Sequence, residues 1–180
     1  MKTEPQGEAL RKRSYYLSVG RLTYAKRIDL AILAANKLNA PLKIVGTGKE
    51  EAYLKSIAGP TVDFVGSVSD SELADLYANA KALIFCALDE DFGMVPVEAM
   101  SYGTPVIALA QGGVLETVVD GKTGLLFSEP EVGELVKTIQ QFDKLTIRPQ
   151  DCYTQAKKFS KERFKKELKS FVEKVSKKSS

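Results

Sequence analysis

Two glutamates eight positions apart, Glu90 and Glu98, are the residues best suited to chemistry. The apolar run 81–88 before them is typical of a buried strand. Pro96, between them, is typical of the first turn of a helix. The sequence therefore predicts one carboxylate at the carboxyl end of a strand and the other inside the next helix.

The start of that helix offers backbone N–H groups without intrahelical acceptors, and the positive end of the helix dipole. Such a start binds phosphate or another anion. Glu98 falls among apolar residues, where an unpaired buried carboxylate would be costly, and ribose hydroxyls would supply a partner. We therefore expect a ligand with phosphate and hydroxyl groups, such as a nucleotide sugar. The alternative is a surface turn with two solvated acids.

Two cations follow the first predicted strand. Gly20 permits a tight turn there, and Arg21 and Lys26 supply a planar fork and a point charge that suit a diphosphate. The alternative, two solvated charges in a loop, stays open on this segment alone.

Two glycine pairs also follow predicted strands. Gly46 and Gly48 lack the third glycine of the dinucleotide-binding fingerprint, which favours a tight strand-to-helix turn. Gly112 and Gly113 permit close approach of a ligand or a facing domain, with a turn into a short helix as the alternative.

The segment after the third predicted strand carries Val68, Ser69 and Asp70. Ser69 and Asp70 favour helix capping, with Glu72 completing a capping box. Capping leaves Val68 free to offer main-chain groups to a base.

The composition limits the chemistry. The chain has 180 residues, of which 44% are hydrophobic and 27% charged, as in a soluble globular domain. It has no histidine, which excludes Ser-His-Asp and Cys-His catalysis. Its two cysteines, Cys86 and Cys152, are too few for a tetrahedral zinc site. Catalytic work therefore falls to carboxylates, Lys, Arg and backbone N–H groups.

Charge and hydropathy bear on partners and location. The net charge of +3 is too small to indicate nucleic acid. No apolar run approaches the ~20 residues of a membrane span, residues 1–13 lack a signal peptide's apolar region, and two unrelated cysteines favour a reducing cytoplasm. The Lys-rich stretch 157–178 indicates a solvated helix face, with a membrane surface or an acidic partner as the alternative.

Short apolar strands alternate with helices along the chain. Strands are predicted at 15–20, 42–46, 62–65, 82–87, 106–109 and 124–127, and helices at 27–38, 50–58, 70–80, 95–102, 113–119, 131–142 and, as one or two helices, 151–174. This alternation predicts a three-layer α/β fold, a doubly wound, Rossmann-like parallel sheet of about six strands with C-terminal helices. Ligands of such folds bind beyond the carboxyl ends of the strands.

Three parts are expected along the chain: a linker or truncation scar over 1–13, a nucleotide-sugar-binding domain over 14–146, and a C-terminal helical segment with a basic tail over 147–180.

Taken together, these segments resemble the C-terminal, donor-binding half of the retaining GT-B glycosyltransferases of family 4, over residues 15–171. The matching signals are Gly20-Arg21 with Lys26, the E-x7-E pair Glu90 and Glu98, Gly112-Gly113 with Glu116, and 119–124, which is similar to the family's D-G-x-T-G segment. Within the family, residues 21–30, 90–100 and 156–164 look closest to bacterial O-antigen mannosyltransferases, with Tyr24-Ala25 standing where Pro-Tyr would be expected.

The resemblance implies a role for each matched residue. Arg21 and Lys26, beside Gly20, would neutralise the leaving diphosphate. Glu90 would bind hydroxyl groups of the donor sugar, and the backbone N–H groups of Phe92, Gly93 and Met94 would bind the sugar and the phosphates. Glu98 would accept hydrogen bonds from the ribose hydroxyls, and Val68 and Asp70 would lie beside the nucleotide base. The implied reaction retains anomeric configuration, needs no metal or other cofactor, and depends on stabilising charge on the leaving group.

The resemblance also implies a donor and a partner domain. The implied donor is GDP-mannose, and the implied acceptor is a saccharide or lipid-linked saccharide of cell-surface polysaccharide synthesis. The N-terminal domain that would hold the acceptor does not fit within 180 residues. We therefore expect the chain alone to be inactive, and the full-length enzyme to be cytoplasmic, with peripheral association at the inner face of the plasma membrane.

The sequence argues against two other functions. A sugar-nucleotide epimerase of GT-B architecture would depend on histidines, which the chain lacks. A non-catalytic nucleotide-sugar-binding module, built like a flavodoxin-like receiver, would need an acidic cluster at the end of the first strand, where Gly20-Arg21 stand instead.

Overall fold

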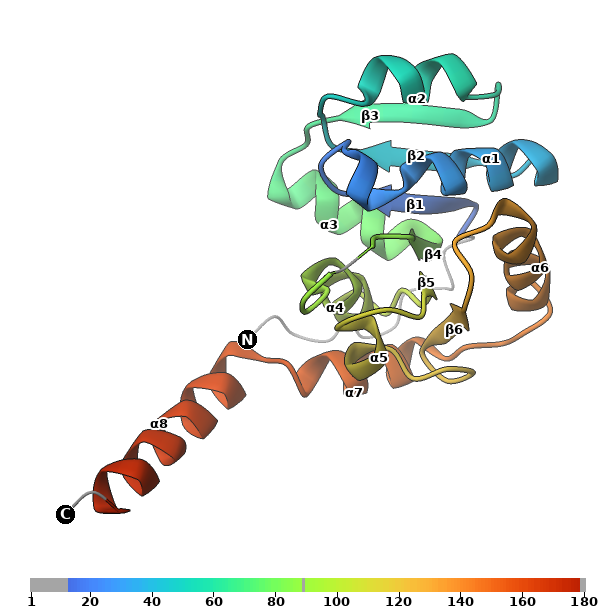
Figure 1. The fold of residues 1–180 in the computed structure, drawn as a ribbon. Helices are drawn as coiled ribbons and strands as arrows, with labels where there is room; N and C mark the ends of the chain where they lie inside the picture. The colour runs from blue at the N-terminus through green and yellow to red at the C-terminus, as the bar shows by residue number, and fades with distance from the viewer. Residues whose placement is uncertain (1–12, 89, 179–180) are drawn as a thin grey trace.

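The computed structural model describes residues 13–88 and 90–178. Their core is one parallel sheet of six strands in the order β3-β2-β1-β4-β5-β6 (Figure 1). The strands are β1 (Tyr15–Val19), β2 (Leu42–Val45), β3 (Val62–Gly66), β4 (Ala80–Phe85), β5 (Val106–Leu109) and β6 (Gly124–Phe127). This order confirms the doubly wound fold and places the topological switch point between β1 and β4.

Helices connect the strands and follow the last one. They are α1 (Ile28–Leu38), α2 (Glu51–Ile57), α3 (Asp70–Asn79), α4 (Met94–Ser101), α5 (Val114–Thr117), α6 (Val132–Phe142), α7 (Pro149–Lys157) and α8 (Lys161–Lys178), with a short 3-10 helix, η1 (Tyr24–Lys26), after β1. The η1 turn was not predicted. It ends at Arg27, whose left-handed backbone (φ 47°) starts α1 one residue later than expected.

The sheet separates two hydrophobic cores, because successive side chains of a strand point to opposite faces. In β4, Ala82 and Ile84 face the core beneath α1, α2 and α6, whereas Leu83 and Phe85 face the core beneath α3, α4 and α7. Burial on both faces explains why these strands read as continuous apolar runs.

The two C-terminal helices differ in how they pack. The helix α7 packs against α4, and Cys152 and Ala156 lie in the second core. Burial raises the pKa of the Cys152 thiol to about 12, so this cysteine is a packing residue. The helix α8 projects away from the body (Figure 1), and its Phe164 and Phe171 side chains are exposed.

The predicted linker 1–13 lies outside the described residues except for Arg13, which donates a hydrogen bond to the Gly103 carbonyl at 2.9 Å. Among the described helices, none combines the length and the apolar character needed to cross a membrane.

Candidate functional site

The loops after β1 and β4 meet at the switch point. The η1 turn follows β1, and the Leu88 N–H, after β4, donates to the Ala25 carbonyl in η1 at 2.8 Å. Because the carboxyl ends of both strands lie at this edge, side chains from segments far apart in sequence come together here.

Lys26 and Glu90 form an ion pair between these two loops. Their side chains are 27% and 26% exposed, so the pair is half-buried. The Lys26 ammonium also lies 5.9 Å from the centre of the Phe85 ring. The family resemblance implied a diphosphate as the partner of Lys26 and sugar hydroxyls as the partners of Glu90, and the structure brings the two residues into direct contact.

The other members of the first loop lie close by. The Gly20 N–H donates to the Val45 carbonyl at 3.0 Å, which fixes the turn at the end of β1. Arg21 follows immediately, and its side chain is exposed.

The amino terminus of α4 follows Glu90 by four residues. Its N-cap, Gly93, is buried and has φ 75°, a left-handed conformation that costs glycine little, and none of the described side chains caps this helix. The side chains of Phe92 and Met94 on either side are exposed. The arrangement leaves a helix start of the kind that binds anions.

Glu98 lies one turn further along α4 and is exposed. The expectation that its apolar neighbours bury it is therefore wrong, because those neighbours turn toward the core while Glu98 does not. The Tyr77 hydroxyl of α3 donates to the Glu98 carboxylate at 3.2 Å. Burial, followed by the charge of Glu98, raises the pKa of Tyr77, which keeps this hydroxyl protonated as a donor.

The loop before α3 matches its predicted capping role. The Ser69 hydroxyl accepts from the Glu72 N–H, and the Glu72 carboxylate accepts from the Ser69 N–H at 2.8 Å. Asp70 is the first residue of α3 and is exposed, and Val68 is half-buried against the second core.

The glycine pair Gly112-Gly113 faces the chain itself. A Cβ on Gly112 would lie 2.3 Å from the Glu90 carbonyl oxygen, and a Cβ on Gly113 would lie 2.4 Å from Cα of Phe92. The Gly113 N–H donates to the Glu90 carbonyl at 2.9 Å. The close approach that we expected from a ligand or a facing domain is made by the Glu90 loop, so this pair positions Glu90.

The other glycine pair joins the first two loops. A Cβ on Gly46 would lie 2.0 Å from the Gly20 carbonyl oxygen, and one on Gly48 would lie 2.3 Å from that of Leu22. These contacts support the tight-turn interpretation of 46–48, with no need for a dinucleotide.

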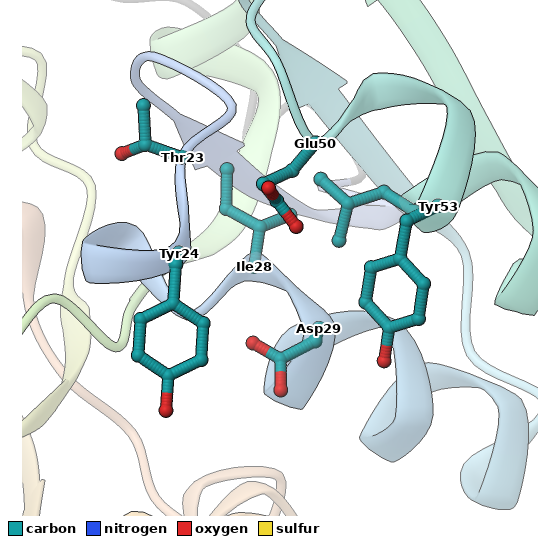
Figure 2. A pocket seen from close by; sticks show the side chains of 7 residues that line it. Thr23, Tyr24, Ile28, Asp29, Glu50 and Tyr53 are labelled. Atoms are coloured by element: carbon teal, nitrogen blue, oxygen red, sulfur yellow. The ribbon is translucent and has the colours of Figure 1, made fainter.

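A surface pocket of about 280 Å³, lined by residues from η1, α1 and α2, adjoins the first loop (Figure 2). Its lining residues are Thr23, Tyr24, Ile28, Asp29, Glu50, Tyr53 and Leu54. None of them was among the predicted site residues. The two tyrosines lie 29 positions apart, and no local pattern in the sequence connects them.

The described residues contain no group of three or more His, Cys, Asp or Glu side chains placed to hold a metal ion. The site instead combines a paired cation, an exposed arginine, an uncapped helix start and two carboxylates. This set can bind a ligand that carries anionic and hydroxyl groups.

Comparison with known proteins identifies the family. Residues 2–159 match the family model described as glycosyl transferases group 1, so the chain belongs to that family. An uncharacterized glycosyltransferase of Methanocaldococcus jannaschii is 36% identical over 118 residues, which cover 61% of this chain and 30% of that protein. A D-inositol 3-phosphate glycosyltransferase of Mycobacterium tuberculosis is 35% identical over 142 residues, covering 73% of this chain and 30% of the relative. The chain thus spans under a third of these relatives.

Solved structures agree on the fold. The apo form of the lipopolysaccharide outer core galactosyltransferase WaaB superposes with a TM-score of 0.81 at 20% identity, covering 93% of this chain and 51% of that one. A structure of Anabaena Alr3699/HepE in complex with UDP and glucose superposes with a TM-score of 0.71 at 25% identity, covering 92% and 49%. The domain is Rossmann-like and of the GT-B type.

The close packing of the Glu90 loop on Gly112 predicts that a larger residue at this position destabilises the fold. Gly112→Ala should lower the free energy of unfolding, by about 1–2 kcal/mol for the left-handed backbone alone (φ 58°), with the clash against Glu90 adding to it. Urea unfolding midpoints measure the change.

The matched control is Gly133→Ala in α6, where an added Cβ meets nothing within 4 Å. This change should leave stability unchanged or raise it by about 0.4–1 kcal/mol. Equal midpoints for the two variants would contradict the tight contact at Gly112.

Proposed function

We propose that this chain is the donor-binding part of a retaining glycosyltransferase of family 4. The proposed reaction transfers a hexose, with mannose from GDP-mannose as the proposed donor, to a saccharide or lipid-linked acceptor in cell-surface polysaccharide synthesis. The observation that carries the proposal is the meeting of Lys26, Glu90 and the uncapped start of α4 at the switch point. Membership of the glycosyl transferases group 1 family supports it.

In this proposal the positive groups face the diphosphate. Lys26 leaves Glu90 and binds the phosphates with Arg21 and the N–H groups at the start of α4. The N–H groups of Phe92, Gly93 and Met94 are the proposed donors there. Charge that develops on the leaving diphosphate is thereby stabilised without a metal in the proposed mechanism.

The carboxylates face the hydroxyl groups of the donor. Glu90, once released from Lys26, accepts from the sugar hydroxyls. Glu98 accepts from the ribose hydroxyls while Tyr77 fixes its orientation. Val68 and Asp70 are proposed to lie at the base, because both follow β3, Val68 in the loop and Asp70 at the start of α3.

The rest of the enzyme is proposed to supply the acceptor site. The chain spans under a third of its curated relatives, so the activity of the whole protein is part of this proposal. We propose that the exposed apolar side chains of α8 pack on an N-terminal, acceptor-binding domain, and that the isolated chain does not transfer sugar. A cytoplasmic location, with peripheral association at the plasma membrane through the basic tail, completes the proposal.

Calorimetry in EDTA tests the donor site. The domain should bind GDP more tightly than GMP, because each charge-assisted hydrogen bond contributes about 1.5–3 kcal/mol. GDP should also bind more tightly than UDP, the nucleotide found in the Anabaena complex. Equal affinities for GDP and GMP would contradict the proposal that the site binds a diphosphate. A preference for UDP over GDP would contradict only the proposal that the donor is GDP-mannose.

The two glutamates should differ in their effects. Glu98→Ala should weaken nucleoside diphosphate binding, by about tenfold for each 1.4 kcal/mol lost. Glu90→Ala should spare that binding, because it frees Lys26, and should lower turnover of the full-length enzyme, because the sugar contact is lost. The division of roles is wrong if both variants bind nucleoside diphosphate equally weakly.

A further inference from the structure

The pocket beside η1 has an apolar floor and aromatic walls. Ile28 and Leu54 form the floor, and each is 3% exposed. Tyr24 and Tyr53, which are 73% and 52% exposed, stand on opposite sides, and Asp29 lies between them (Figure 2). Such a site presents flat apolar surfaces to a ligand of modest size.

The polar groups of the pocket are mainly acceptors. The carboxylates of Asp29 and Glu50 accept hydrogen bonds only, and the hydroxyls of Thr23 and the two tyrosines can accept or donate. Within 13–88 and 90–178, no lysine or arginine lines the pocket. A phosphate is therefore repelled, and a ligand that supplies several donors is favoured.

The pocket is held in shape before any ligand arrives. The Glu50 N–H donates to the Leu22 carbonyl at 3.0 Å, and the Leu22 N–H donates to the Thr47 carbonyl at 2.9 Å. These bonds fix the start of α2 against the loop that leads into η1. Binding would therefore leave this backbone in place, and the ordering cost would fall on the exposed tyrosine side chains.

Arg27 determines which ligand charge the pocket favours. Its guanidinium binds both Asp29 oxygens, at 3.1 Å each, and lies 5.8 Å from the centre of the Tyr24 ring. It therefore neutralises one carboxylate and already occupies the cation position on one aromatic wall. A cationic ligand would find only the charge of Glu50, whereas a neutral polyol can use both carboxylates as acceptors.

We propose that this pocket binds one pyranose ring of the neutral saccharide acceptor, at a distance from the reacting end that the N-terminal domain is proposed to hold. The C–H face of the ring would stack on the tyrosine rings, and the hydroxyl groups of the sugar would donate hydrogen bonds to the carboxylates of Asp29 and Glu50. The identification of this ligand as the acceptor rests on the proposed function. Tyr24 and Lys26 belong to the same turn, so the pocket lies next to the proposed donor site. A saccharide bound in the pocket would therefore lie at the edge of the donor site.

The test is a titration of the ¹⁵N-labelled 180-residue protein with the methyl pyranosides of mannose, glucose, galactose and N-acetylglucosamine. At least one glycoside should shift the amide signals of 23–29 and 50–54 in a saturable way. Tyr53→Ala should weaken this binding by about tenfold, the loss of about 1.4 kcal/mol. Tyr53→Phe, which keeps the ring, should retain most of it.

Phe164→Ala is the matched control, because Phe164 is an aromatic residue that is 65% exposed on α8, away from the pocket. It should not change glycoside binding. Failure of all four glycosides to shift 23–29 and 50–54, or equal losses in Tyr53→Ala and Phe164→Ala, would overturn the proposal.

Two further titrations separate this proposal from its alternatives. Choline, a cationic probe, should bind more weakly than the best glycoside, and tighter choline binding that is lost in Glu50→Gln would overturn the saccharide assignment in favour of an amine. GDP should bind Tyr53→Ala as it binds the unchanged protein. Glycoside binding without GDP binding would uphold the pocket while contradicting the donor site.

Discussion

The ion pair between Lys26 and Glu90 is the contact on which the candidate site depends. It joins the loops that follow β1 and β4 and so spans the switch point of the sheet. The side chains of this pair are about one quarter exposed, and its net contribution to stability is small because the cost of desolvating both charges offsets their attraction. The pair instead fixes the positions of two charged groups, because it holds the Lys26 ammonium and the Glu90 carboxylate at the switch point in the absence of a ligand. In the proposed function, an incoming diphosphate replaces Glu90 as the partner of Lys26.

Other contacts would confine the proposed exchange to the side chains of Lys26 and Glu90. Gly112 and Gly113 hold the Glu90 backbone in place, so the Glu90 side chain can leave Lys26 without the loop moving. Tyr77 fixes Glu98 from α3 in the same way. The pocket beside η1 has the opposite electrostatic character, because acceptors line it and Arg27 compensates one of them. Adjacent surfaces of one turn thus favour anionic and neutral ligands respectively.

The sequence predicted the sheet and its helices because strands buried on both faces read as apolar runs, and because Ser69 with Glu72 marks a helix start by itself. It did not predict contacts between distant segments. Lys26 and Glu90 lie 64 positions apart, and their pairing follows only from the strand order. The exposure of Glu98 depends on how α4 is rotated against the core, which its mostly apolar sequence leaves undetermined. The left-handed Arg27 and the pocket that it borders likewise lack a local signal.

In the proposed site, Lys26 exchanges Glu90 for the diphosphate of the donor. A crystal structure of this chain with a bound nucleoside diphosphate tests it most directly, through the distances from Lys26 Nζ to the Glu90 carboxylate and to the phosphate oxygens. We expect phosphate oxygens within hydrogen-bonding distance of Lys26 and of the α4 N-terminus, with Glu90 turned toward the sugar position. A complex in which Lys26 stays paired with Glu90 and the diphosphate binds elsewhere would contradict it.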